Sequence, residues 1–113
     1  MSNRNNISEV IRQYFHAYEI KDRSILEELL SDEFTFSSPQ DDRINRETYF
    51  ERCWPFAELV KTITLEKIFV EENEAFARYE CIMNDGKSFR NTEFFTAENG
   101  KIKSVDVYFG RET

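Results

Sequence analysis

The second half of the chain contains four consecutive segments that are rich in β-branched and aromatic residues. They are TITLEKIFVEE, EAFARYECIMN, KSFRNTEFFTAE and KIKSVDVYFG, and the turn signals ENE, NDGK and ENGK lie between them. NDG and ENG suit short hairpin connections, so the pattern predicts four antiparallel strands joined as a meander. Long strands in a sheet of so few members favour strong curvature.

The first half of the chain has the apolar spacing of helices. This spacing predicts an amphipathic helix over residues 6–21, and Asp22 is placed to cap a second, shorter helix. A strand is predicted over residues 34–38, ended by the proline that follows it, with QDDR as the turn. Asn45 is predicted to cap a third helix, which Pro55 should end or kink.

Helices followed by a long antiparallel sheet predict an α+β fold. We expect three N-terminal helices packed in the concave face of a strongly curved, mainly antiparallel sheet. The length of 113 residues suits one domain, residues 1–113, with a single core. An aromatic content of 15% suits a bulky interior.

The net charge of −7 argues against nucleic acid as a partner, because binding to phosphates requires a basic patch. The opening MSNRNNISEV has no apolar signal core, and no apolar run reaches membrane length, so a cytoplasmic protein is expected. Cys53 and Cys81 lie in apolar neighbourhoods and are predicted to be reduced, buried thiols. With one histidine and no clustering of cysteine and histidine, neither a metal site nor a cofactor is predicted.

The order of these elements, together with particular residues, resembles the nuclear transport factor 2-like superfamily. That superfamily includes ketosteroid isomerase, scytalone dehydratase and the SnoaL-type polyketide cyclases. The resemblance covers residues 6–110 and is carried by YFHAYEIKDRSILEELLSDEFTFSSP, by YFERCWP and by FRNTEFF with NGKIKSVDVYFG. It implies a cone in which a curved sheet wraps the first helix around a deep pocket, and a homodimer formed through the outer sheet face.

The resemblance also bears on the isomerase residues. The family's general base is an aspartate just before the proline that ends the first strand, and here Ser38 stands there. Without a histidine placed to activate it, a serine hydroxyl cannot shuttle protons near neutral pH. The family's oxyanion tyrosine aligns with Tyr14, and its protonated aspartate aligns near Thr92. The chain is therefore expected to be a member without the isomerase aspartates.

For three other polar residues, the sequence allows either a structural or a catalytic role. Asp41 and Asp42 follow the proline and are predicted to be solvated turn formers, the alternative being a displaced base. His16, between apolar neighbours on the first helix, is predicted to be a satisfied or partly exposed helix residue. The alternative, a catalytic base, is kept open.

Placing the strands on the family fold predicts which residues line the pocket. Tyr14 and inward-facing strand residues should lie inside the cone, and Ser38 and Trp54 near its mouth. The inward-facing set is Arg78, Glu80, Arg90, Thr92, Phe94, Val105, Val107 and Phe109. The two arginines against one glutamate would suit a weakly anionic ligand. Alternatively, the charged residues lie on the outer face and form exposed pairs, because one residue of register reverses every side chain.

Three functions are compatible with these features. The first is a small-molecule-binding protein of the SnoaL-like type, whose hydrophobic pocket holds an apolar or weakly anionic ligand. The second is a lyase, isomerase or cyclase that uses Tyr14 as hydrogen-bond donor and Glu80 as base. The third is a dimeric interaction module whose pocket is filled by its own side chains. A pocket carboxylate with a raised pKa would favour the enzyme, and an open cavity of a few hundred Å³ would favour the binder.

Overall fold

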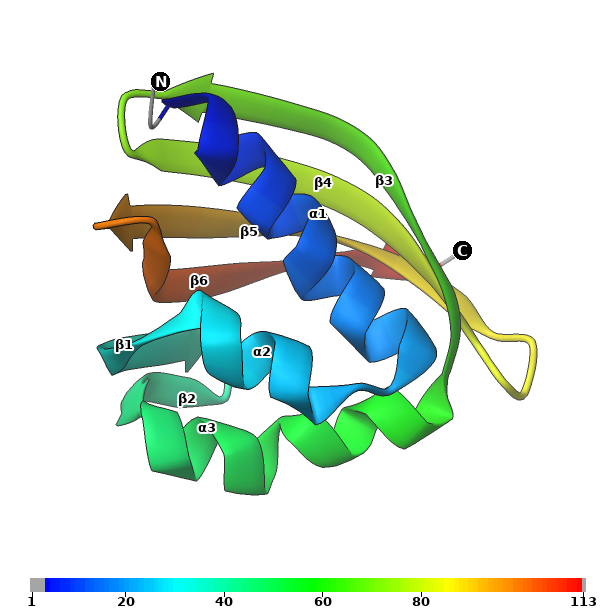
Figure 1. The fold of residues 1–113 in the computed structure, drawn as a ribbon. Coiled ribbons are helices and arrows are strands. Elements are labelled where there is room, and N and C mark those ends of the chain that lie inside the picture. Colours follow the sequence, from blue (N-terminus) through cyan, green and yellow to red (C-terminus); the bar gives the residue numbers. More distant parts are fainter. Residues whose placement is uncertain (1–3, 113) are drawn as a thin grey trace.

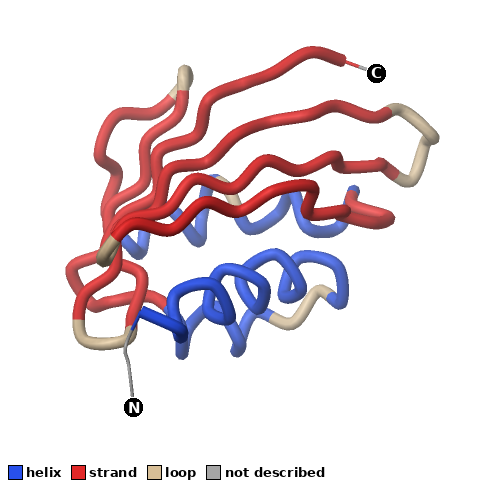
Figure 2. The backbone as a smooth tube through the Cα atoms, turned by 90° about the horizontal axis from the view of Figure 1, so that it is seen from above, coloured by secondary structure: helices blue, strands red, loops and turns tan. Residues whose placement is uncertain are grey.

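The computed structural model describes residues 4–112, which form helices packed against one curved sheet (Figure 1). The order of the elements is α1 (Arg4–Ile20), α2 (Arg23–Leu29), β1 (Leu30–Ser38), β2 (Asp41–Asn45), α3 (Arg46–Arg52), η1 (Trp54–Leu59), β3 (Val60–Glu71), β4 (Glu74–Met83), β5 (Ser88–Glu98) and β6 (Lys101–Glu112). The sheet and the helices form two layers (Figure 2). The predicted α+β class is confirmed.

The sheet has six strands in the order β2-β1-β6-β5-β4-β3. The β1–β6 pair is parallel, and the other pairs are antiparallel. The meander from β3 to β6 is the predicted one. The sheet is therefore mainly antiparallel, and its long strands bend around the helices (Figure 1).

The helix boundaries follow from local capping. The Asp22 side chain accepts a hydrogen bond from the Ser24 backbone N–H at 3.0 Å, and Asn45 accepts one from the Thr48 N–H at 2.9 Å. Both caps are as predicted. Pro55 follows the end of α3 and lies in the first turn of the 3₁₀ helix η1, where a missing N–H costs no hydrogen bond.

The first hairpin differs from the prediction. The strand begins at Leu30 rather than at residue 34, and most of QDDR is strand β2 rather than turn. Two side chains stabilise this tight connection, because Ser38 Oγ accepts from the Gln40 N–H at 3.1 Å and Ser37 Oγ accepts from the Arg43 N–H at 3.0 Å. The predicted turn is therefore reduced to residues 39–40.

The core lies between α1 and the concave face of the sheet. Ile11 and Ala17 of α1 are fully buried, as are Ala77 of β4 and Phe95 of β5. Within the described part of the chain, no helix is both long and apolar enough to cross a membrane.

Candidate functional site

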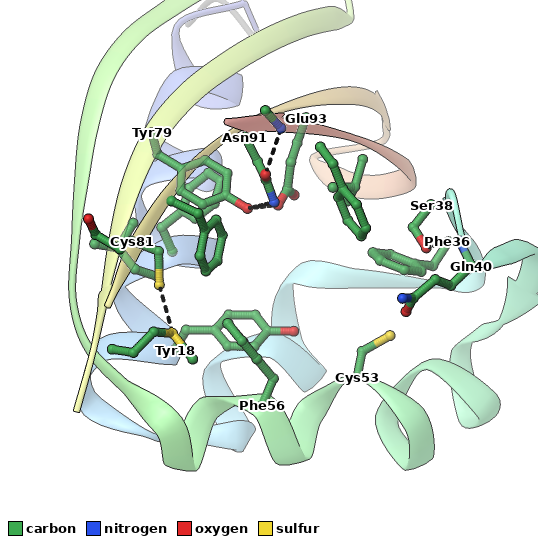
Figure 3. A pocket seen from close by; sticks show the side chains of 18 of the residues that line it. Tyr18, Phe36, Ser38, Gln40, Cys53, Phe56, Tyr79, Cys81, Asn91 and Glu93 are labelled. Carbon is green, nitrogen blue, oxygen red and sulfur yellow. Dashed lines mark hydrogen bonds between the residues drawn. The ribbon is translucent and has the colours of Figure 1, made fainter. Parts of the chain in front are cut away.

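A cavity of about 860 Å³ lies between the helices and the concave face of the sheet (Figure 3). Much of its wall is aromatic, formed by Tyr14, Phe15, Tyr18, Phe36, Phe56, Tyr79, Phe89 and Phe109. The volume falls within the usual range of small-molecule sites, roughly 300–1,000 Å³. The space is not filled by the protein's own bulky side chains.

Among the residues whose burial is described, Glu93 of β5 is the one buried charged residue, and its side chain is directed into this cavity (Figure 3). It is 5% exposed. Its Oε2 atom accepts a hydrogen bond from the Tyr79 hydroxyl at 2.7 Å. Its Oε1 atom is buried and has no hydrogen-bond partner among the described residues. A buried polar atom without a partner is costly, which marks this carboxyl group as the chemical centre of the cavity.

The direction of the hydrogen bonds around Glu93 is set by Asn91. The Gly110 backbone N–H donates to Asn91 Oδ1 at 3.1 Å, so the amide nitrogen of Asn91 turns toward Tyr79. That nitrogen donates to the Tyr79 hydroxyl oxygen at 3.2 Å. The Tyr79 proton is therefore left to donate to Glu93 Oε2.

Gly110 makes this arrangement possible through a close approach of β6 to β5. A Cβ atom at this position would lie 2.1 Å from the Arg90 carbonyl oxygen, which no side chain could tolerate. The pairing of β5 and β6 is irregular between Phe89 and Asn91, next to this contact. The glycine thus allows its N–H to hold the Asn91 amide.

The pKa of Glu93 is raised to about 7 from an ordinary value of 4.5. The main cause is burial, which disfavours the charged form, and the hydroxyls of Tyr79 and Tyr14 lower the pKa in part. Near neutral pH, both protonation states of the carboxyl group are therefore populated. A group with this property is able to accept or donate a proton at physiological pH.

Three tyrosine hydroxyls meet near one end of α1. The Tyr49 hydroxyl lies 2.5 Å from that of Tyr18 and 3.3 Å from that of Tyr14. Tyr14 and Tyr18 line the cavity, whereas Tyr49 is fully buried in α3. Burial raises the pKa of all three phenols, so they act as neutral hydrogen-bonding groups.

The mouth of the cavity carries an ion pair and a thiol. Asp41 Oδ1 lies 2.7 Å from an Arg52 guanidinium nitrogen, and the Asp41 side chain is only 12% exposed. The prediction that Asp41 is a solvated turn residue is therefore wrong, because this arginine of α3 covers it. Cys53 and Cys81 also line the cavity as free cysteines. Burial raises the pKa of each thiol to about 11, which does not favour a nucleophilic thiolate.

Some of the residues predicted to line the pocket lie in the cavity wall, and others do not. Tyr14, Ser38, Val107 and Phe109 lie in the cavity wall, and Val105 is buried in the core. Trp54 is half-buried against Tyr18, with ring centroids 5.0 Å apart, and does not line the cavity.

The placement of the other strand residues inside the cone is wrong. Arg78, Glu80, Arg90, Thr92 and Phe94 lie on the outer face of the sheet, because the residues that alternate with them are the buried ones. The Arg78 guanidinium lies 3.1 Å from Glu66, and that of Arg90 also lies 3.1 Å from it. On the outer face these charges stay in contact with water. Their ion pairs therefore do not have to compensate for the free-energy cost of removing the charges from water.

The resemblance aligned the family's protonated aspartate near Thr92, and the acid that the structure places in the cavity is the next residue. Glu93 follows Thr92, and its neighbour across the strands is Ala77. A signal for this register was present in β4. One of its faces, with Arg78 and Glu80, is charged, whereas Ala75, Ala77, Tyr79 and Cys81 carry no charge. The uncharged face is the one expected to be buried, and hairpin pairing then places Glu93 inside.

His16 does not contribute to the cavity. Its side chain is 57% exposed and lies 3.8 Å from Glu19 of the same helix, as expected for a partly exposed helix histidine. Across residues 4–112, no group of three or more histidine, cysteine or acidic side chains is arranged to hold a metal ion.

The family assignment comes from residues 11–105, which match the model of the SnoaL-like domain. The chain belongs to the SnoaL-like family. This SnoaL-like protein is similar to an NTF2-like protein of unknown function from Cytophaga hutchinsonii, with 25% identity, a TM-score of 0.76 and coverage of 91% of this chain and 88% of the other.

Two further similarities concern the fold alone. An LEH-like epoxide hydrolase from M. tuberculosis has 15% identity and a TM-score of 0.79, with coverage of 96% of the SnoaL-like protein and 85% of the hydrolase. A de novo designed protein with a curved β-sheet has 19% identity and a TM-score of 0.84, with coverage of 96% and 88%. No curated protein sequence matches the chain. Function must therefore be argued from the cavity.

Proposed function

We propose that the protein binds a small, largely apolar molecule in the cavity of the cone, with the Glu93 carboxyl group as its polar anchor. The observation that carries this proposal is the Oε1 atom, which is buried without a partner in the wall of a cavity of about 860 Å³. Aromatic walls with a small number of polar groups are typical of ligand sites. The open volume argues against a module whose pocket is filled by its own side chains.

The proposal is tested by titrating the protein with an uncharged phenyl-substituted alcohol, phenylbutanol, and following backbone amide shifts by NMR. Shifts should concentrate on residues around the cavity and saturate. Replacing Val107 by a larger side chain, Val107→Trp, should reduce binding because it occupies the cavity. Outer-face variant Thr92→Val is the matched control and should bind as the parent does. Shifts scattered over the surface without saturation would contradict the proposal.

A second candidate function is acid–base catalysis of the lyase, isomerase or cyclase type. The pKa of Glu93, about 7, favours it, because a general base is most effective when its pKa is near the working pH. Glu93 takes the role that the sequence assigned to Glu80, and Tyr14 remains a candidate hydrogen-bond donor. A bell-shaped or sigmoidal rate profile with a midpoint near the Glu93 pKa, absent in Glu93→Gln, would support turnover once a substrate is found.

We also propose that two copies of the chain associate through the outer face of the sheet. Phe69, Phe76, Phe94 and Tyr108 lie on that face, and Phe69, Phe76 and Tyr108 are exposed. Glu66, Arg78 and Arg90 bring both signs of charge to the same face, so the face can be complementary to its own copy. Light scattering should give twice the chain mass, and Phe76→Lys should give the monomer. A monomeric parent protein at high concentration would contradict this proposal.

A further inference from the structure

The charge of the cavity is opposite in sign to that expected from the sequence. Arginines predicted inside the cone lie outside it, and the charged group of the core is an acid. The described residues of the cavity wall include three acidic and two basic side chains, which are Asp41, Asp85, Glu93, Arg52 and Lys87. A site of this kind does not suit an anionic ligand.

The two cations do not neutralise Glu93. Arg52 is paired with Asp41 at 2.7 Å in the mouth. Lys87 is exposed in the turn between β4 and β5. Among the described residues, no ion pair involves Glu93, and its carboxyl group is hydrogen-bonded by the neutral Tyr79 hydroxyl alone. The charged form of Glu93 therefore lacks a counter-ion within the described structure.

The aromatic wall favours a positively charged group in the same place. Tyr14 and Phe15 of α1 and Tyr79 of β4 line the cavity together with Glu93. The ring centroids of Tyr14 and Phe15 are 5.1 Å apart, and those of Phe15 and Tyr79 are 4.7 Å apart. The faces of aromatic rings carry negative electrostatic potential and attract organic cations. Neutral hydroxyls of buried tyrosines add acceptor oxygens without adding a competing positive charge.

From these contacts we infer that the cavity selects ligands that carry a protonated amine on an apolar body, with the ammonium group donating to Glu93 Oε1. The inference rests on the proposed binding function. Oε1 is the atom left free by the Asn91–Tyr79–Glu93 hydrogen-bond chain, so it is the place where a ligand donor is required. The bond from the ammonium group gives the buried Oε1 atom a hydrogen-bond donor, and the ammonium charge acts as the counter-ion of the carboxylate.

Binding of such a cation is coupled to the protonation of Glu93. The ammonium group stabilises the carboxylate, so near pH 7 binding should release a proton to the solvent. The titratable groups that surround Glu93 on its neighbouring elements all have pKa values raised by burial and remain neutral in this range; they are Tyr14, Tyr18, Tyr49, Cys53 and Tyr79. The facing strand residue in β6 is Val107, which has no titratable group.

The test compares three ligands that share one apolar body and differ in charge: phenylbutylamine, phenylbutanol and phenylbutyrate. Affinities are measured by calorimetry at about pH 8.5 and about pH 5.5, on either side of the Glu93 pKa. At the higher pH the amine should bind on the order of tenfold more tightly than the alcohol. Phenylbutyrate should bind more weakly than the alcohol. At the lower pH the preference for the amine should largely disappear.

Two variants test whether the preference for the amine is due to Glu93. Glu93→Gln should lose the preference for the amine over phenylbutanol. Glu66→Gln removes the same charge from the outer face and should keep the preference, which separates a direct contact from the net charge of the protein. If Glu93→Gln does not fold, proton release by the parent protein, measured in buffers of different ionisation enthalpy, still tests the inference.

The outcomes separate the inference from the proposed function. Equal binding of the amine and the alcohol by the parent protein, or the same amine preference in Glu93→Gln, would overturn the inference and leave the proposed function standing. Absence of proton release on amine binding near pH 7 would overturn it as well. If none of the three ligands enters the cavity, the proposed function and the inference both fail.

Discussion

The two faces of strands β4 and β5 differ in how their charged side chains are stabilised. On the outer face, Arg78 and Arg90 both lie 3.1 Å from Glu66, and these groups remain partly in contact with water. On the inner face, Glu93 is 5% exposed and is stabilised by a tyrosine hydroxyl rather than by a cation. Arg90 and Glu93, which lie on opposite faces of β5, therefore experience very different environments.

The charges of the outer face are stabilised by water, whereas the buried carboxyl group of Glu93 is not. Exposed ion pairs form and break with little change in free energy, about 0–1 kcal/mol, because water solvates both partners. A buried acid without a counter-ion lowers stability whenever it ionises. Its presence in the wall of an open cavity supports a role for Glu93 in binding or catalysis rather than in folding.

The largest expected contrast comes from two neighbouring phenylalanines. Phe95 is fully buried under α1, whereas Phe94 lies on the outer face against Phe76, with ring centroids 4.7 Å apart. Phe95→Ala should lower the free energy of unfolding by about 3–5 kcal/mol, because it leaves a cavity in the core. Phe94→Ala should cost no more than about 1.5 kcal/mol, since an aromatic pair on the outer face loses less burial than a core residue does. Urea denaturation measures both, and equal losses would contradict the assignment of the two faces.

The next effect concerns the dependence of stability on pH. The folded-state pKa of Glu93 is raised, so between pH 4.5 and about 7 the folded protein holds more protons than the unfolded chain. The contribution of Glu93 to stability is therefore present at low pH and is lost as the pH rises through this window. The free energy of unfolding of the parent protein relative to Glu93→Gln should fall by about 3 kcal/mol from about pH 4 to about pH 8.

Denaturation of Glu66→Gln over the same pH range is the matched control for this comparison. Glu66 lies on the outer face, so its replacement should change stability by no more than about 1 kcal/mol at any pH. A difference between the parent protein and Glu93→Gln that does not vary with pH would mean that Glu93 titrates as an ordinary surface acid.

A smaller effect should follow from removing one hydrogen bond to Glu93. The Tyr79 hydroxyl donates to Oε2 and thereby lowers the pKa of the carboxyl group. In Tyr79→Phe the Glu93 pKa should rise further above 7, which an NMR titration of the Glu93 carboxyl carbon would measure. Tyr108→Phe removes a hydroxyl from the outer face and should leave that pKa unchanged. A lower Glu93 pKa in Tyr79→Phe would show that Tyr79 does not donate to Oε2.

The smallest effects are expected from the arginines of the outer face. Arg78→Ala and Arg90→Ala each remove one exposed ion pair with Glu66 and should lower stability by less than about 1 kcal/mol. Neither substitution should alter the binding of phenylbutylamine, because both side chains lie outside the cavity. Loss of binding in either variant would restore the sequence-based placement of these arginines in the pocket.

Much of the fold could be predicted from the sequence because it depends on local signals. Asp22 and Asn45 cap helices through their own neighbours, and the hairpin turns of the second half match the observed strands. The apolar spacing also identified the buried face of the first helix, which includes Tyr14.

The candidate site was harder to predict because it depends on which face of a strand is buried. Apolar residues occur on both faces of β5, where Phe94 and Phe95 are adjacent, so alternation alone does not decide between Thr92 and Glu93. The hydrogen bond from Gly110 to Asn91 is also invisible in the sequence, because it depends on the approach of two strands. The uncharged face of β4 was the one local signal that could have decided the register.

The central claim is that Glu93 is a buried acid in the cavity wall, and its pKa tests that claim most directly. The measurement is a pH titration of the parent protein, with the Glu93 carboxyl carbon followed by NMR and assigned by comparison with Glu93→Gln. A midpoint near 7 is predicted, because burial without a counter-ion disfavours the carboxylate. A midpoint near the ordinary value of 4.5 would show that the carboxyl group is solvated or paired, and would contradict the account.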